Sequence, residues 1–178
     1  VFRSTRPYAP GTTGSIFRIN ADGTGARDLL SAWPSNKERP SVSPDGQWIA
    51  FVSEGALWRM RVDGSELTFL TGGAEIHTTA WSADGTHIYF SIASTCSEDI
   101  GIIGADGSNP RVLVTGGDTI DRPVASRVSV SVTGELAVIG AACYQSDNVL
   151  YLMDSDGKNV RRMLAPVQEA SWSPDGQR

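Results

Sequence analysis

The chain has 178 residues, 40% of them hydrophobic and 20% charged, and its formal net charge is −5 with a pI near 4.9. This acidic balance argues against a general nucleic-acid-binding protein and against docking on an anionic membrane surface. No apolar run approaches the roughly 20 residues that a membrane-spanning helix needs, so we expect no membrane insertion. Nineteen glycines and nine prolines indicate many turns in place of long helices.

In chain order, the first predicted elements are short β-rich runs, each rich in β-branched or aromatic residues. The N-terminal part contains VFRST (1–5), SIFRIN (15–20) and, after an Asp-Gly turn, ARDLL (26–30). The next part has a strand pair around an Asp-Gly turn in SVSPDGQWIAFVS (41–53) and a second pair around the turn of LWRMRVDG (57–64). Asp-Gly between β-rich runs predicts a hairpin, because glycine accepts the positive φ of a tight turn.

The same two phrases then recur at a period of about 40–50 residues. The first phrase returns as AWSADGTHIYFSI (80–92), SVSVTGELAVIG (129–140) and SWSPDGQR (171–178), and the second returns as IGIIGADG (100–107) and LYLMDSDG (150–157). One unit therefore reads as strand a, turn, strand b, loop, strand c, turn, strand d. Four antiparallel strands per unit at this period predict an all-β fold, a β-propeller of four-stranded blades.

The stretch SPDGQWIAFVSEGALWRMRVDGSELTFLT (43–71) resembles the PD40, or WD40-like, repeat of the TolB-like propellers. The resemblance extends over nearly the whole chain, with SVTG (131–134) as the most divergent turn. TolB-like repeats occur in periplasmic scaffold proteins, in peptidase propellers and in extracellular domains of bacterial proteins. The resemblance thus implies the architecture and a periplasmic or extracellular location, but it leaves the activity open.

The two ends of the chain look like two halves of one blade. SWSPDGQR supplies strand a and its turn, whereas VFRST, SIFRIN and ARDLL match strands b, c and d. We therefore expect one propeller domain over 1–178 with four blades. Their approximate bounds are 38–71, 76–115, 124–165, and a composite blade of 168–178 plus 1–30. A closed four-bladed monomer is the favoured interpretation. A two-fold homodimer that exchanges half blades and a fragment of a longer propeller are the alternatives.

Because strand direction alternates, all Asp-Gly turns lie on one face, which we call the hairpin face. The b–c loops and the connections between blades share the opposite face, the loop face, and binding residues usually lie on such variable loops. Strand a is innermost, so the residues that precede it surround a central channel. Aligning the repeats places Glu38, Arg39, His77, Arg127 and Glu169 at the mouth of this channel. Two arginines there can hold an anionic group or a peptide terminus, or the charges can form an internal salt-bridge network that fills the channel.

Three aromatic residues in the loops, Trp33, Tyr8 and Tyr144, are candidate ligand contacts, although each can equally serve local packing. Cys96 and Cys143 fall at nearly equivalent positions of the b–c loops in neighbouring units. Either they form a disulfide, which would suit an oxidising compartment, or they are two free thiols.

No catalytic constellation, cofactor motif or metal-ligand spacing is recognisable in the sequence. Only two histidines are present, and DSDG (154–157) lacks the spacing of a calcium loop. We therefore expect a non-enzymatic scaffold that presents its loop face to a protein or peptide partner, with no catalytic residue, cofactor or metal. A propeller hydrolase or lyase, a peptidase-gating domain and a structural part of a larger propeller are the alternatives.

Overall fold

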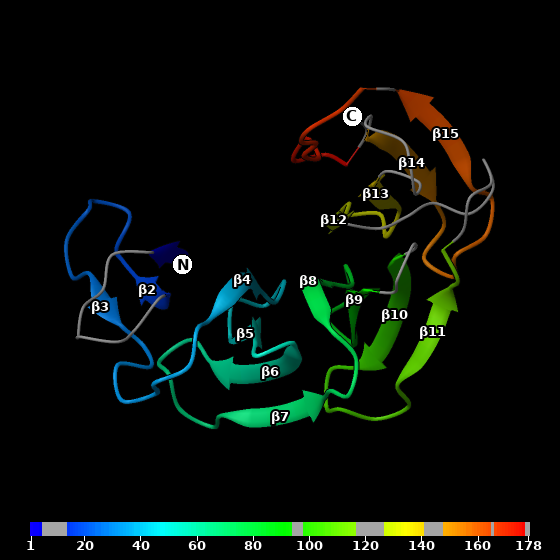
Figure 1. Ribbon diagram of the computed structural model, residues 1–178. Helices are drawn as coiled ribbons and strands as arrows, with labels where there is room; N and C mark the ends of the chain where they lie inside the picture. The colour runs from blue at the N-terminus through cyan, green and yellow to red at the C-terminus, as the bar shows by residue number, and fades with distance from the viewer. Residues whose placement is uncertain (5–13, 94–97, 117–126, 141–147, 165, 177–178) are drawn as a thin grey trace.

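In a computed structural model, the structure describes residues 1–4, 14–93, 98–116, 127–140, 148–164 and 166–176. Every regular element among these residues is a β-strand, and the strands form four antiparallel sheets arranged along an arc (Figure 1). The all-β propeller architecture predicted from the repeat is thereby confirmed for the described part of the chain.

Three of the sheets have four strands in the order of the chain, and we number them as blades 1 to 3. Blade 1 contains β4 (Glu38–Val42), β5 (Trp48–Ser53), β6 (Ala56–Arg61) and β7 (Thr68–Thr71). Blade 2 contains β8 (Ile76–Trp81), β9 (His87–Ala93), β10 (Glu98–Gly104) and β11 (Arg111–Val114). Blade 3 contains β12 (Arg127–Val130), β13 (Leu136–Gly140), β14 (Val149–Met153) and β15 (Arg161–Leu164). The N-terminal sheet contains β1 (Phe2–Ser4), β2 (Ser15–Arg18) and β3 (Arg27–Asp28).

The aspartates of the hairpin face stabilise their own turns through side-chain-to-backbone hydrogen bonds. In each turn, the carboxylate accepts a hydrogen bond from the backbone amide two residues later, at 2.9–3.1 Å. This holds for Asp22, Asp45, Asp63, Asp84, Asp106 and Asp156. The following glycine takes a positive φ, for example 90° at Gly64. These aspartates are therefore turn residues, as the sequence predicted.

The sheets pack face to face through three apolar clusters. Ile16 and Phe51 belong to the cluster between the N-terminal sheet and blade 1, and Leu57 and Ile103 to the one between blades 1 and 2. The third cluster joins blades 2 and 3 around Val138. The c–d turns add a repeated contact, because Gly64, Gly107 and Gly157 each lie against the leucine of the preceding outer strand, Leu29, Leu70 and Leu113.

The predicted composite blade is only partly formed. Residues 1–30 give a three-stranded sheet, but the described part of 166–176 contains no strand, and no pairing joins it to β1. The two termini lie at opposite ends of the arc, so closure of the ring is not observed (Figure 1). Among the described strands, none pairs with the segment that carries the strand-a phrase.

Candidate functional site

The innermost strands of the three blades, β4, β8 and β12, border two cavities that share Val128 and Ser129 as lining residues. One cavity, of about 210 Å³, opens on the loop face, and the other, of about 420 Å³, opens on the hairpin face. Because they share a wall, we treat them as the two ends of one axial channel.

The loop-face end of the channel is charged. Arg39, Thr78, Arg127 and Glu169 line it together, one residue from each of four successive repeats. Arg39, Arg127 and Glu169 are positions that the repeat alignment placed at the channel mouth, and Thr78 is the chain neighbour of the predicted His77. The structure therefore brings together three of the predicted site residues, Arg39, Arg127 and Glu169, and whether they bind a ligand stays a prediction.

Irregular pairing at the start of strand a shapes this mouth. The register of β4 against β5 shifts between Glu38 and Ser41, and Arg39 adopts a φ of 50° within the irregularity. The register of β8 against β9 shifts in the same place, between Ile76 and Thr79. A bulge redirects side chains at the edge of a sheet, and a positive φ is uncommon outside glycine. The bulges thus give the residues around the mouth their directions, which the sequence pattern does not contain.

The two arginines of the mouth differ in their partners. Arg127 donates to the Glu169 carboxylate at 2.8 Å and to the Gln168 carbonyl at 3.2 Å. The Glu169 side chain is 79% exposed, so this ion pair is screened by water and readily exchanged. Arg39 is exposed, and its guanidinium has no hydrogen bond or ion pair with a described residue. Among the residues that the structure describes, the mouth therefore offers Arg39 as an unpaired cation and Arg127 as a weakly held one.

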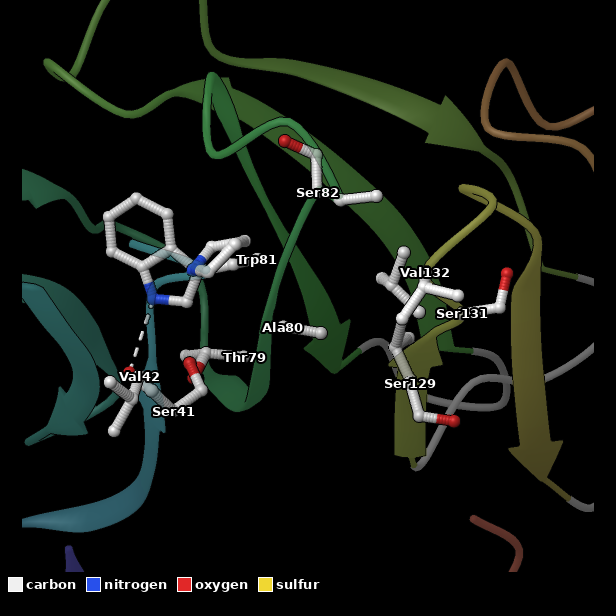
Figure 2. Close-up of a pocket in the computed structure, with 13 residues that line it drawn as sticks. Ser41, Val42, Thr79, Ala80, Trp81, Ser82, Ser129, Ser131 and Val132 are labelled. Atoms are coloured by element: carbon white, nitrogen blue, oxygen red, sulfur yellow. Dashed lines mark hydrogen bonds between the residues drawn. The ribbon is translucent and has the colours of Figure 1, made fainter. Parts of the chain in front are cut away.

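The hairpin-face end of the channel is lined by hydroxyls and small apolar side chains (Figure 2). Ser41 and Thr79 share a hydrogen bond of 2.8 Å, and Thr79 also donates to the Arg39 carbonyl at 3.0 Å. Trp81 donates its indole N–H to the Ser41 carbonyl at 3.1 Å and is 6% exposed. Trp81 is thus a packing residue between blades. The loop-face end of the channel is thus charged, and the hairpin-face end combines hydroxyls with apolar side chains.

Two other predicted site residues, Glu38 and His77, line a separate cavity of about 390 Å³ between blades 1 and 2 on the loop face. Each is the chain neighbour of a channel residue, Arg39 or Thr78, and neighbouring residues of a strand point to opposite sides. The start of strand a therefore contributes to two cavities. Glu38 and His77 do not line the channel mouth, where the sequence pattern predicted them.

His77 lies between two carboxylates that the sequence analysis did not assign to it. Its Nε2 is 3.4 Å from Glu75 Oε1, and its Nδ1 is 3.3 Å from Glu98 Oε1. Burial raises the pKa of Glu98 above its usual value, while the contact with His77 lowers it in part. The strand pairing explains why Glu98 lies near His77. Ile76 of β8 pairs with Ile92 of β9, and Ala93 of β9 pairs with Glu98 of β10, so the three strands meet at this end of the blade.

The third group of predicted residues comprises aromatic and cysteine side chains. Trp33 packs edge-on against Trp58, with ring centroids 4.7 Å apart, and belongs to the core cluster under the N-terminal sheet. This contact supports the packing interpretation. Tyr8, Tyr144, Cys96 and Cys143 lie outside the described residues.

No three His, Cys, Asp or Glu side chains among the described residues are grouped closely enough to hold a metal ion. No helix in the described part has the length and apolar character needed to cross a membrane.

Comparison with known proteins places the fold. No model of a known protein family matches the chain. An uncharacterized protein of Agrobacterium fabrum is 26% identical over 171 residues, which is 90% of this chain and 44% of that protein. Among solved structures, a candidate TolB from Agrobacterium tumefaciens superimposes with a TM-score of 0.71 at 22% identity, over 85% of this chain and 57% of that one.

Other solved propellers give the same result. TolB from Acinetobacter baumannii has a TM-score of 0.57 at 18% identity, over 94% of this chain and 53% of that one. A chain of the nidogen/laminin complex has a TM-score of 0.68 at 16% identity, over 85% of this chain and 58% of that one. Prolyl endopeptidases and a manganese-bound oligogalacturonate lyase also share the architecture.

These identities establish the fold and leave the activity open. The chain spans about half the length of the relatives that it matches. By its sheets, its repeat and its neighbours, the chain has the fold of a β-propeller, and TolB is among the proteins that share it.

Proposed function

We propose that this propeller is a binding module that holds a protein or peptide partner on its loop face, with a partner carboxylate seated between Arg39 and Arg127. The observation that carries the proposal is the convergence of two arginines from separate blades on one cavity, one of them without a partner among the described residues. Guanidinium groups bind carboxylates through paired, charge-assisted hydrogen bonds.

The rest of the channel fits a peptide ligand. Next to the arginines, Thr78 and Ser129 offer polar groups, and the cavity on the hairpin face is lined by Val42, Val130 and Val132, of which Val42 and Val132 are exposed. A peptide that ends in a carboxylate and carries an apolar side chain nearby would match this order of charged, polar and apolar surfaces. The partner in this proposal is therefore a C-terminal peptide segment, and we place the protein in the periplasm or outside the cell.

The experiment uses a library of short peptides with free C-terminal carboxylates, presented to the fluorescently labelled 178-residue chain. Binding by the selected peptides should weaken about tenfold to a hundredfold when both Arg39 and Arg127 become Gln, because a charge-assisted hydrogen bond contributes about 1.5–3 kcal/mol. The same peptides with amidated C-termini should also bind weakly. Glu169→Gln should tighten binding, since it removes a competing carboxylate.

The matched control is Arg111→Gln, which removes an exposed arginine from the outer strand β11 and leaves the net charge equal to that of a single channel variant. It should leave the affinity unchanged. Peptide binding that ignores both arginine substitutions, or that drops equally with Arg111→Gln, would refute the carboxylate site.

A second candidate is catalysis, favoured by the position of His77 between Glu75 and Glu98 in a cavity. A histidine oriented by a carboxylate can serve as a general acid or base. Turnover of peptide or oligosaccharide substrates that disappears in His77→Gln would support an enzyme. Activity that survives this substitution would exclude His77 from that role.

A further inference from the structure

The innermost strands of the three blades carry side chains of different size at one equivalent position, which is Val42 in β4, Trp81 in β8 and Val130 in β12. Each of these residues pairs with a fully buried aliphatic residue of strand b. The pairs are Val42–Ile49, Trp81–Ile88 and Val130–Leu136. Trp81 belongs to the cluster between blades 1 and 2, and Val130 packs against the cluster between blades 2 and 3. The side chain at this position therefore points to the preceding blade, and it is an indole at one junction but an isopropyl group at the next.

Between blades 1 and 2, the indole of Trp81 closes the hairpin-face end of the junction. Figure 2 shows the ring on the blade 1 side of β8. Its N–H donates to the Ser41 carbonyl at 3.1 Å, and the side chain is buried. Thr79, two residues earlier on the same side of β8, shares a 2.8 Å hydrogen bond with the Ser41 hydroxyl. The ring thus fills the space between two blades and finds an acceptor on the neighbouring innermost strand.

Between blades 2 and 3, the equivalent groups are missing. Val130 stands in the place of Trp81, and Val128 stands in the place of Thr79. The methyl group of Ala80 points toward blade 3 (Figure 2), and no side-chain hydrogen bond from a described residue reaches the Ala80 carbonyl. The cavity of about 420 Å³ opens here, and most of its lining residues belong to β8, β12 and the turns that follow them. It therefore lies where the repeat would place a second indole.

We propose that this cavity binds a small planar aromatic ring that carries an N–H donor, such as indole. The ring would lie against Val130 and Ala80, and its N–H would donate to the Ala80 carbonyl, as Trp81 donates at the preceding junction. The size is adequate, because a cavity of about 150 Å³ is enough to bind benzene and small-molecule sites span roughly 300–1,000 Å³.

The proposed ligand is independent of the carboxylate site on the loop face. The ring carries no charge, and neither Arg39 nor Arg127 lines this cavity. A failure of one site therefore does not imply a failure of the other, and the probe below contains no carboxylate.

The experiment titrates the 178-residue chain with free indole by isothermal titration calorimetry. We expect saturable binding of one indole per chain. Val130→Trp supplies the ring from within the chain and should abolish this binding. The matched control is Val112→Trp, which makes the same change on the exposed outer strand β11 and should bind indole as the wild type does.

A milder variant and a changed probe extend the test to the case in which Val130→Trp does not fold. Ala80→Val narrows the same space by two methyl groups and should weaken indole binding about tenfold. N-methylindole lacks the donor and should bind the wild type about twofold to tenfold more weakly than indole, because one neutral hydrogen bond is lost.

Two probes that carry the same ring distinguish its possible sources. N-acetyltryptophanamide presents the ring on a peptide-like backbone, whereas indole presents it alone, and tighter binding of either one supports the site while naming the source. Wild-type protein that shows no saturable binding of either probe would overturn the proposal. Indole binding that is unchanged by both Val130→Trp and Ala80→Val would also overturn it, because the ring would then lie elsewhere.

Discussion

The two faces of the propeller use carboxylates in opposite ways. On the hairpin face, aspartates accept short hydrogen bonds from their own turns, and these bonds lower their pKa values. On the loop face, Glu98 is half-buried beside His77, and its desolvation raises its pKa. The aspartate turns of the hairpin face are thus locally satisfied, whereas the loop face keeps a half-buried acid and a bulged strand with Arg39 at positive φ, whose guanidinium has no partner among the described residues.

Within each repeat, the residues of the hairpin face therefore serve the fold, and those of the loop face are the candidates for binding. Local rules are broken where the surrounding fold holds a residue in a costly state, and such positions tend to be functional. If this is so, substitutions on the hairpin face should destabilise the fold, whereas a substitution of Glu98 on the loop face should stabilise it. The expected effects follow from the largest to the smallest.

The largest effect should come from Gly64→Ala on the hairpin face. A Cβ there would lie 2.6 Å from the Leu29 carbonyl oxygen, and the backbone φ is 90°. We expect a loss of roughly 3 kcal/mol or more of unfolding free energy, from the left-handed backbone and the clash together. The matched control is Gly23→Ala, which has the same turn position and a φ of 82° but nothing within 4 Å. It should cost only about 1–2 kcal/mol. Equal losses in urea titrations would show that the contact between sheets is unimportant.

The next effect concerns Lys37, the fully buried lysine beneath the loop before blade 1. Its ammonium donates to the Trp33 carbonyl at 2.9 Å and the Leu30 carbonyl at 3.3 Å. Lys37→Met should lower the unfolding free energy by about 1–3 kcal/mol, because the Trp33 carbonyl loses its donor and the Leu30 carbonyl keeps only the Trp33 amide. Lys158→Met, which changes an exposed lysine on the hairpin face, should have little effect.

The pH dependence of the same variant checks the cause. Burial lowers the pKa of Lys37, so between that value and its usual 10.5 the unfolded chain binds more protons than the folded one. Wild-type stability should therefore gain from this residue as the pH rises through that window, and the Met variant should lack this gain. Thermal unfolding at a series of alkaline pH values measures it, and parallel curves for the two proteins would contradict the assignment.

A smaller effect is expected from Asp84 on the hairpin face. Hydrogen bonds from Ser82 and Thr86 lower its pKa from 3.8 to about 2. A carboxyl whose pKa is depressed on folding stabilises the protein above the unfolded value, and this stability is lost as the pH falls from about 4 to about 2. Asp84→Asn should flatten the loss of stability in this range. An unchanged acid-unfolding profile would mean that the turn hydrogen bonds do not depend on the charge.

The smallest effect, and the one of opposite sign, belongs to Glu98 on the loop face. Its pKa is raised on folding, so its contribution to stability is present below the unfolded value and is lost as the pH rises through the folded value. Glu98→Gln should therefore gain stability relative to wild type as the pH rises above the usual glutamate pKa of 4.5, by about 1 kcal/mol or less. The same comparison in a His77→Gln background removes the histidine contact and should retain the trend. A relative loss over this range would show that the pair with His77 outweighs burial.

Much of the loop-face site followed from the repeat. Because Arg39, Thr78, Arg127 and Glu169 share one register, alignment alone placed them around the axis, and they line one cavity. The separation of Glu38 and His77 into a second cavity was missed, although it follows from the alternation of neighbouring residues along a strand. The carboxylates around His77 were missed because Glu98 comes from another strand of the same blade.

The sequence by itself determined the strands, the turns and the equivalence of the blades, because Asp-Gly chemistry and alternating apolar residues act over a few neighbouring residues. Only the tertiary structure decided where side chains point at the start of strand a, which charges meet, and whether segment 168–176 pairs. These outcomes depend on contacts between distant strands, because hydrogen bonds between strands form only where packing brings two edges together.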